Sequence, residues 1–261
     1  MFSRLTWVKQ ILLQAALTDK YTGEGMGMTA EKLAEIYNIS RHEQDEFALL
    51  SNERAAKARA AGKFAEEIVA VKVKTRKGDV LIDTDEHIKE GGSLESLAKL
   101  RPSFKRDGSV TAANASGIND GAASIVVASE AYVKEQGLKP IARIVSWGVA
   151  GVDPSIMGIG PVPAIQQALK KADLTLTDMD LIEVNEAFAA QYLAVEKELD
   201  LNRDKTNVNG GAIALGHPVG ASGTRIILSS AYELKRRGGK YAVASLCIGG
   251  GQGIALIIEA L

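Results

Sequence analysis

The chain of 261 residues has little cysteine and little histidine: Cys247 stands alone, and there are three histidines. A single cysteine excludes an intramolecular disulfide and fits a reducing compartment, which we expect to be the cytoplasm rather than the mitochondrial matrix. No apolar run approaches the ~20 residues that span a bilayer, so we expect no membrane partner. The net charge is −1, which argues against a nucleic-acid partner.

The remaining composition is ordinary for a soluble globular protein, with 46% hydrophobic and 24% charged residues. The length suits one large or two ordinary domains. The first twenty residues carry Arg4 and Lys9, no acid before Asp19 and an apolar stripe at helical spacing. A transit peptide would be richer in arginine and serine. We therefore favour an amphipathic first helix, or a shifted start, over a targeting segment.

Strands alternate with helices of ten or more residues, a pattern that indicates an α/β layered sheet. Ser40 and Glu43 form a capping-box sequence that predicts the start of a long helix, and Gly62 predicts its end. Thr29 is the expected cap of a shorter helix. Residues 75–110 are charged and turn-rich, and we expect them to wrap the surface. Strands are expected at 69–73 (half-buried), 123–128, 142–147, 181–184, 243–247 and 254–259, and helices at 29–38, 40–62, 129–137, 163–171, 186–199 and 222–237.

Two glycine-rich stretches hold the residues with the most obvious chemistry. Residues 207–223 read NVNGGAIALGHPVGASG around His217, and residues 245–251 read SLCIGGG around Cys247. Glycine lets the backbone approach a ligand closely. A histidine in a tight turn can also simply bond its neighbours, and a cysteine at a strand end is commonly a buried small hydrophobe. Asn185 follows a strand, where it is either a helix N-cap or a functional amide.

With NEAFAAQ at 185–191 and NASGINDGAA at 114–123, these blocks make the chain resemble the thiolase family, most closely its biosynthetic branch, the acetyl-CoA C-acetyltransferases. The resemblance runs from about Leu17 to the C-terminus. It implies an α/β, thiolase-like layered fold that pairs two βαβαβαββ halves. On that template, residues 1–118 are an N-terminal extension and the loop domain, residues 119–139 a remnant of the N-terminal half, and residues 140–261 a complete C-terminal half.

The resemblance implies an acyltransferase that condenses two acetyl-CoA to acetoacetyl-CoA and CoA, or runs the reverse thiolysis. His217 would activate a nucleophilic cysteine and help to bind the thioester oxygen. Cys247 would be the acid/base that takes a methyl proton. Asn185 would hold a water of one oxyanion hole, and the Gly249 N–H would belong to a second. The family's nucleophilic cysteine lies in an N-terminal segment that we expect this chain to lack.

The resemblance also implies where CoA binds. CoA is expected as a thioester substrate, with no tightly bound cofactor and no metal. The pantetheine tunnel would be lined by Ser116, Phe104, Met157 and Phe188, and the nucleotide end would meet Ser96 and Lys89. Met26 and Leu17 complete the expected CoA contacts. His42 and His87 lie among charged residues and are expected to be solvated.

Several functional alternatives stay open. Acetyl-CoA, acetoacetyl-CoA and CoA are the expected small-molecule partners, and the chain is expected as a homo-oligomer or with a partner chain that supplies the absent half. One alternative is a 3-ketoacyl-CoA thiolase of fatty-acid degradation, which the surroundings of Met157 and the segment DEHIKEGG disfavour. The other is a non-catalytic acyl-CoA-binding or truncated thiolase chain.

Overall fold

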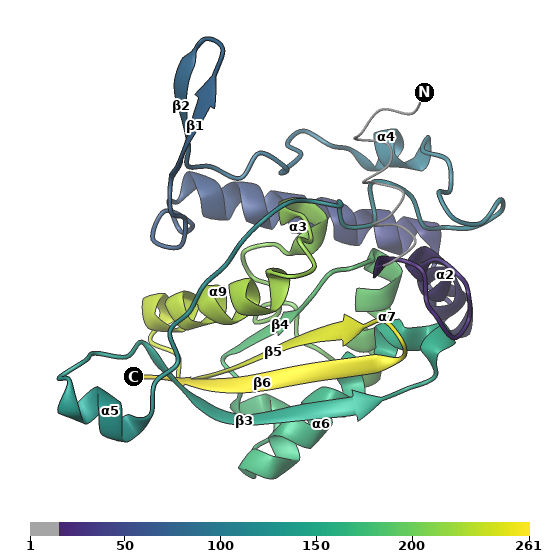
Figure 1. Ribbon diagram of the computed structural model, residues 1–261. Helices are drawn as coiled ribbons and strands as arrows, with labels where there is room; N and C mark the ends of the chain where they lie inside the picture. Colours follow the sequence, from purple (N-terminus) through teal and green to yellow (C-terminus); the bar gives the residue numbers. More distant parts are fainter. Residues whose placement is uncertain (1–15) are drawn as a thin grey trace.

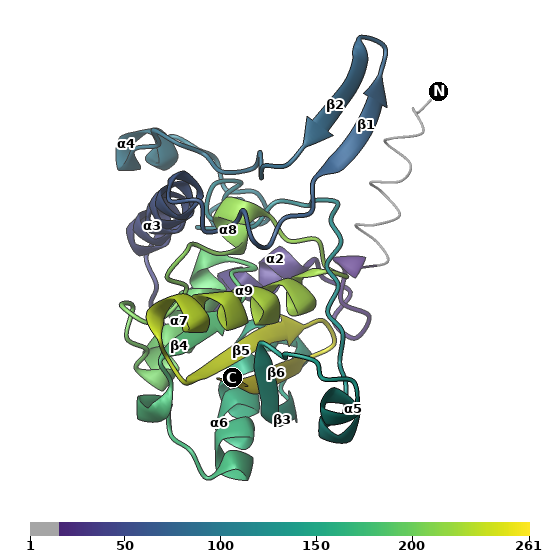
Figure 2. The ribbon, with the colours of Figure 1, turned by 90° about the vertical axis from the view of Figure 1, so that its left-hand side faces the viewer.

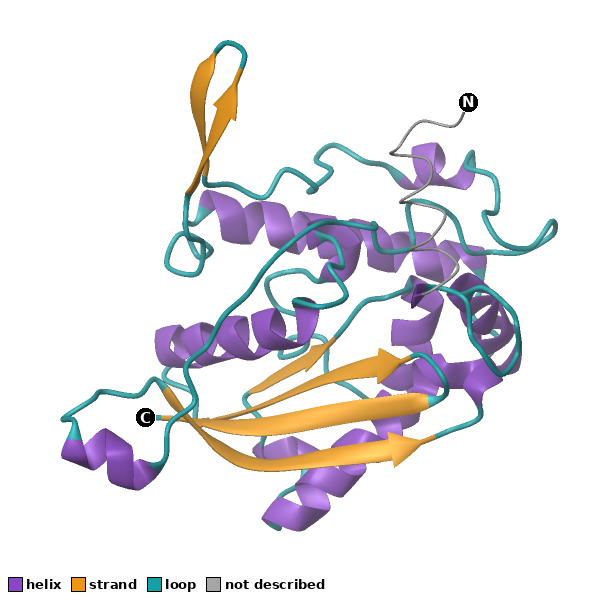
Figure 3. Ribbon diagram, viewed as in Figure 1, coloured by secondary structure: helices purple, strands orange, loops and turns teal. Residues whose placement is uncertain are grey.

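The centre of the molecule is a mixed four-stranded sheet (Figures 1 and 3). The computed structural model describes residues 16–261, so the first helix expected from the sequence lies outside the described residues. The strand order is β3-β6-β5-β4. β4 and β5 run parallel, whereas β6 is antiparallel to both of its neighbours. The bounds are β3 Ala142–Gly151, β4 Leu181–Val184, β5 Tyr241–Ile248 and β6 Gln252–Ala260.

Helices cover both faces of this sheet, giving the layered α/β architecture that the alternation predicts (Figures 1 and 2). Helix α9 (Ser222–Arg237) lies over one face, and α6 (Pro161–Ala172) lies against β3 on the other. Gly148 allows this second contact, because a Cβ there would lie 2.1 Å from the Ala164 carbonyl oxygen. Helix α7 (Ala189–Leu199) starts three residues later than expected, with Phe188 as its cap.

Beyond β4, the sheet continues as an isolated parallel bridge between Ile182 and Thr206. The Ile182 N–H donates to Lys205 O at 2.8 Å, and the Asn207 N–H donates to Ile182 O at 2.9 Å. The Asn207 side chain then bonds both the N–H and the carbonyl of Val184. Asn207 itself has a φ of +48°, outside the range of a strand, so the ladder ends at this residue and its side chain replaces the next backbone rungs.

Two helices from the N-terminal part of the described chain pack against the helices that lie beside the sheet. Helix α3 (Arg41–Ala60) carries the predicted capping box, in which the Ser40 N–H donates to Glu43 Oε2 at 2.6 Å, and Gly62 follows its end at a φ of +71°. Helix α2 (Met26–Ile36) begins three residues before the predicted cap. The Thr29 hydroxyl donates to Met26 O at 2.7 Å, which is a bond inside the first turn and not a cap.

The segment between α3 and the sheet is extended and largely exposed. Strands β1 (Val71–Thr75) and β2 (Gly78–Ile82) form a hairpin that projects from the body (Figure 2). A strand thus forms close to the predicted range, but every residue of both strands is exposed, so its predicted half-burial was wrong. Residues 123–128 form no strand, since no neighbouring strand in the described part of the chain bonds to them. The remaining short elements are α4 (Leu94–Ala98), α5 (Glu130–Glu135), α8 (Ala212–Leu215), η1 (Pro154–Ile159) and η2 (Leu176–Asp178).

Candidate active site

Asn185 and Cys247 both lie toward one edge of the sheet, because Asn185 directly follows β4 and Cys247 is the penultimate residue of the neighbouring parallel strand β5. Val184 is in register with Ser245, and the Asn185 N–H donates to Ser245 O at 2.9 Å. The carboxyl ends of parallel strands are the usual ligand-binding edge of an α/β sheet. Asn185 is buried, and it does not cap α7, so the N-cap alternative was wrong. Its side-chain oxygen is buried and has no hydrogen-bond partner among residues 16–261.

His217 reaches this edge from the loop before α9. Its Nε2 lies 3.4 Å from Asn185 Nδ2, and its Nδ1 lies 2.6 Å from Ser222 Oγ. The Ser222 hydroxyl in turn donates to Pro218 O at 3.1 Å. A hydroxyl that has given its proton to a carbonyl can only accept from the imidazole, and an amide nitrogen only donates. Nδ1 therefore carries the proton, and Nε2 presents a lone pair beside Asn185.

The surroundings set the protonation states of both candidate acid/base groups. Burial lowers the pKa of His217 to about 4, with a smaller contribution from the positive Arg225, so the imidazole is neutral near pH 7. Burial raises the pKa of the Cys247 thiol to about 12. The resting thiol is therefore protonated and suited to donate a proton. It can accept one only after it has given its own away.

Residues from the segment around Gly117 pack behind His217 and fix the position of its backbone. The His217 N–H donates to Gly117 O at 3.2 Å. Gly216 has a φ of +89°, and a Cβ there would lie 2.4 Å from Asn119 Oδ1, so only glycine fits. His87 belongs to this group of residues too: its Nδ1 bonds Ala214 O at 2.9 Å and the ring is half-buried, which corrects the expectation of a solvated side chain.

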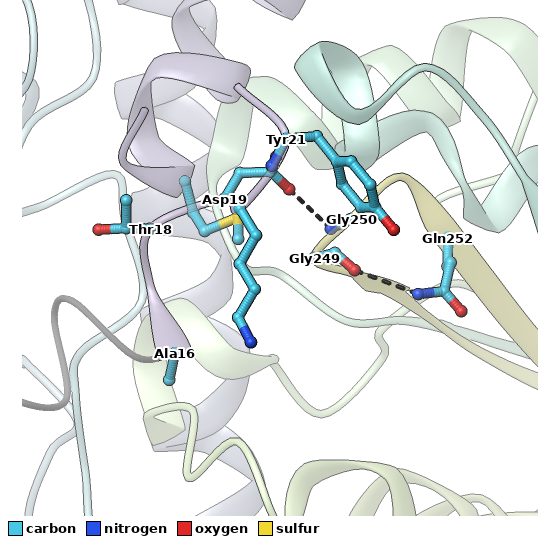
Figure 4. Close-up of a pocket in the computed structure, with 9 residues that line it drawn as sticks. Ala16, Thr18, Asp19, Tyr21, Gly249, Gly250 and Gln252 are labelled. Carbon is cyan, nitrogen blue, oxygen red and sulfur yellow. Dashed lines mark hydrogen bonds between the residues drawn. The ribbon is translucent and has the colours of Figure 1, made fainter. Parts of the chain in front are cut away.

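A cavity of about 260 Å³ opens beside the turn that follows Cys247 (Figure 4). Gly249 forms part of its wall, and a Cβ on Gly249 would lie 2.7 Å from the Met26 methyl. Leu17 does not line the cavity, but its carbonyl accepts a hydrogen bond from the N–H of Met26, which does, at 2.8 Å. Neither His217 nor Cys247 lines this cavity. Its lining residues are Ala16, Thr18, Asp19, Lys20, Tyr21, Met26, Gly249, Gly250 and Gln252.

Several of the predicted CoA contacts lie near one another, close to Met26 and to the segment that follows Asn185. Phe104 packs edge-on against Phe188 with ring centroids 5.9 Å apart, and its ring covers Gly27, next to Met26. The Ser116 N–H donates to Ala187 O at 3.0 Å, beside Phe188.

The remaining predicted contacts differ in their burial. Met157 is buried in η1. Ser96 and Lys89 are exposed, Ser96 in α4 and Lys89 in the segment before it. The structure thus groups three of the four predicted tunnel residues, Phe104, Phe188 and Ser116, near Met26, and leaves the two predicted nucleotide contacts on the outer surface.

Sequence reasoning missed three residues of the site: Ser222, Asn119 and Asp19. Ser222 follows His217 by five positions at the start of a helix, so its proximity could have been found. Asn119 and Asp19 act through contacts between distant segments, which no local pattern reveals. Among residues 16–261 no group of three or more His, Cys, Asp or Glu side chains is placed to hold a metal ion. In the same part of the chain, no helix is both long and apolar enough to cross a membrane.

Comparison with known proteins identifies relatives for nearly the whole chain. The family model for the thiolase N-terminal domain matches residues 5–131, starting before Leu17, and the model for the thiolase C-terminal domain matches residues 138–260. The mitochondrial 3-ketoacyl-CoA thiolase of Homo sapiens is 59% identical over 247 residues, which are 95% of this chain and 62% of that protein. The acetyl-CoA acetyltransferase of Rhizobium meliloti is 54% identical over 250 residues, 96% of this chain and 64% of that protein.

Solved structures agree with these matches. The acetyl-CoA acetyltransferase of Bacillus anthracis superposes with a TM-score of 0.92 at 57% identity, covering 94% of this chain and 62% of that one. Human mitochondrial 3-ketoacyl-CoA thiolase in complex with CoA gives a TM-score of 0.90 at 57% identity, with 94% and 61% covered. The predicted family and fold are confirmed. The chain spans less than two thirds of the length of these relatives.

Proposed function

The chain belongs to the thiolase family, and on that premise we propose that it carries the acid/base machinery of an acyltransferase that acts on CoA thioesters. The observation that supports this best is the neutral His217, whose Nε2 lone pair lies beside Asn185 at the carboxyl ends of β4 and β5. The reaction we favour is the condensation of two acetyl-CoA to acetoacetyl-CoA and CoA, or its reverse.

The chemistry begins with a nucleophilic thiol that is not Cys247. His217 Nε2 takes the proton of that thiol, and the thiolate attacks the carbonyl carbon of acetyl-CoA. The bond from that carbon to the CoA sulfur breaks, and Cys247 gives its proton to the departing CoA thiolate. The Cys247 thiolate then removes a methyl proton from a second acetyl-CoA. The resulting carbanion attacks the acyl-enzyme, which releases acetoacetyl-CoA, and the proton on His217 returns to the nucleophile.

Negative charge on the thioester oxygens needs donors. The protonated His217 supplies one at Nε2, and the unpartnered Asn185 oxygen is placed to hold a water as another. The Gly249 N–H serves the second oxygen. Donors of this kind lower barriers by ~3 kcal/mol each.

The CoA carrier is proposed to run past Met26, Phe104, Phe188 and Ser116. One structural relative, the human mitochondrial 3-ketoacyl-CoA thiolase, is known in complex with CoA, which supports this assignment. Lys89 and Ser96, both exposed, would meet the nucleotide end. A lysine there meets phosphate as a point charge, without the paired bonds of an arginine.

A 3-ketoacyl-CoA thiolase of fatty-acid degradation is the second candidate. It is favoured by the 59% identity to mitochondrial proteins of that name, which matches or exceeds the identity to acetyl-CoA acetyltransferases. Comparing acetoacetyl-CoA with a medium-chain 3-ketoacyl-CoA as thiolysis substrates of the assembled enzyme separates the two.

The test of the proposal uses the purified chain, acetoacetyl-CoA and CoA, and follows the loss of enolate absorbance. Cys247 is the single cysteine of the 261 residues, so with Cys247 as acid/base no thiol remains to accept the acyl group. We expect CoA binding by calorimetry, but turnover several orders of magnitude below that of a complete thiolase. Family-like thiolysis by the chain alone, with an acetyl group on Cys247 by mass spectrometry, contradicts the proposed roles. A non-catalytic chain would bind CoA and stay inactive even when a cysteine-bearing thiolase N-terminal half is added.

We also propose a partner and a compartment. A homo-oligomer, or a complex with a chain that supplies the nucleophile, would cover exposed apolar side chains such as Val126 and Trp147. The single cysteine suits a reducing compartment, and we propose the cytoplasm. Fusing residues 1–20 to a fluorescent reporter tests this, because import into mitochondria would contradict it.

A further inference from the structure

The turn after Cys247 is held by two side chains at a single peptide unit. The Gly250 N–H donates to Asp19 Oδ2 at 2.8 Å, although the two residues are 231 positions apart. The Gln252 side-chain nitrogen donates to the Gly249 carbonyl at 3.3 Å. These two bonds therefore hold both the N–H and the carbonyl group of the Gly249–Gly250 peptide, which lies at the wall of the cavity (Figure 4).

Asp19 is built into the fold as an acceptor. Its carboxylate is buried, with 1% of the residue exposed. While Oδ2 accepts from Gly250, Oδ1 accepts from the Tyr21 N–H at 2.8 Å and the Thr22 N–H at 2.9 Å. The amide bonds, that of Thr22 foremost, hold the pKa of Asp19 below its ordinary value against the opposing effect of burial. The group is therefore an anion whose two oxygens are both in use.

The turn needs such a restraint. Gly250 and Gly251 both have positive φ, +81° and +79°, and glycine pairs move easily between backbone conformations. The neighbouring peptide carries the Gly249 N–H, and β5 places Cys247 two residues earlier. Fixing the Gly249–Gly250 peptide removes the freedom that would let this N–H and the thiol drift.

We propose that Asp19 is a positioning residue for acyl transfer: its carboxylate fixes the Gly249–Gly250 peptide and so sets the direction of the Gly249 N–H and the enclosure of the Cys247 thiol. The contact follows from the geometry alone, whereas its role in acyl transfer rests on the proposed function. Gln252 assists from the carbonyl side.

Asp19→Asn separates the two halves of this arrangement. Asparagine keeps one acceptor oxygen, which suffices for the Tyr21 and Thr22 amides, and asparagine favours such turns. Its NH2 group then faces the Gly250 N–H, donor against donor. The matched control is Asp178→Asn, because Asp178 also accepts a backbone N–H, from Thr175 at 2.8 Å, but far from Cys247 on an exposed turn.

The experiment follows alkylation of Cys247 by iodoacetamide, which reports on one thiol because the chain has one cysteine. For Asp19→Asn we expect a rate increase of about tenfold or more, the size that follows from losing a hydrogen bond to a charged group. The pH at which the rate rises should also fall, because a hydrated thiol ionises more readily. In the amide NMR spectrum, the Gly250 proton should move upfield. Asp178→Asn should leave the rate, the pH dependence and the Gly250 signal unchanged.

An Asp19→Asn variant with wild-type alkylation kinetics and an unmoved Gly250 amide would overturn the proposal. If circular dichroism shows that this variant does not fold, Gln252→Glu takes its place, because it sets a carboxylate oxygen against the Gly249 carbonyl from an exposed position. Faster alkylation is then expected, and an unchanged rate contradicts the proposal. None of these readouts uses CoA. Failure of the wild-type chain to bind CoA would sink the proposed function and leave the contact itself standing.

Discussion

The site depends first on the state of single residues, above all on a neutral His217. A side chain whose Nδ1 proton is held by Ser222 and whose Nε2 lone pair faces the Asn185 amide can accept a proton at Nε2. A charged imidazole could not. The burial that keeps His217 neutral lowers the free energy of unfolding at low pH, and this loss of stability can be measured.

We predict that His217 does not titrate between pH 5 and 8. Its pKa is lowered from 6.5 to about 4 in the folded chain, so the unfolded chain binds the proton more readily. The stability it contributes is complete above about pH 6.5 and is lost as the pH falls toward about 4, with a slope of at most ~1.4 kcal/mol per pH unit. Urea unfolding at pH 5 and pH 7 measures this. His217→Gln should remove that part of the difference, and an equal difference in the variant would contradict the assignment.

At the scale of elements, the β5–β6 hairpin carries the turn after Cys247 and has no room for a larger residue at Gly253. A Cβ on Gly253 would lie 2.0 Å from the Gly160 carbonyl oxygen, which is backbone and cannot rotate away. We predict that Gly253→Ala destabilises the chain by about 2 kcal/mol or more. Gly220→Ala is the control, because nothing lies within 4 Å of its Cβ, and it should stay within about 0.5 kcal/mol of wild type. Equal melting of both variants would contradict the packing described.

The elements that sequence reasoning predicts well are those with local signals. The capping box at Ser40, the strand Leu181–Val184 and the helix Ser222–Arg237 are found where they are expected. The strand at 123–128 failed because an apolar run becomes a strand only beside a bonding neighbour. The end of backbone pairing at Asn207 could not be predicted either, because there the Asn207 side chain, and not its backbone, bonds β4. The motifs predicted that Asn185 and His217 belong to one site, but they gave no indication that Asp19 contacts the turn after Cys247.

The whole molecule leaves apolar surface uncovered. Val126 is 94% exposed and Val127 69%, and Trp147 and Val149 are half exposed on β3, which ends the sheet. Patches of this kind usually mark interfaces, and an edge strand invites pairing. We predict dimers, larger oligomers or aggregates in light scattering of the purified chain, or co-purification of a cysteine-bearing partner. A monomer that survives dilution and melts cooperatively would show that the fold closes by itself.

We propose that one sheet edge of this molecule, at the carboxyl ends of β4 and β5, binds a CoA thioester. A titration of isotope-labelled chain with acetyl-CoA tests this directly, since NMR reports each residue separately. We predict saturable shifts of the His217 ring, the Asn185 side-chain amide and the Gly249 amide, with the exposed His42 ring unmoved as an internal control. Shifts that are absent, or that fall only on surfaces away from β4 and β5, would contradict it.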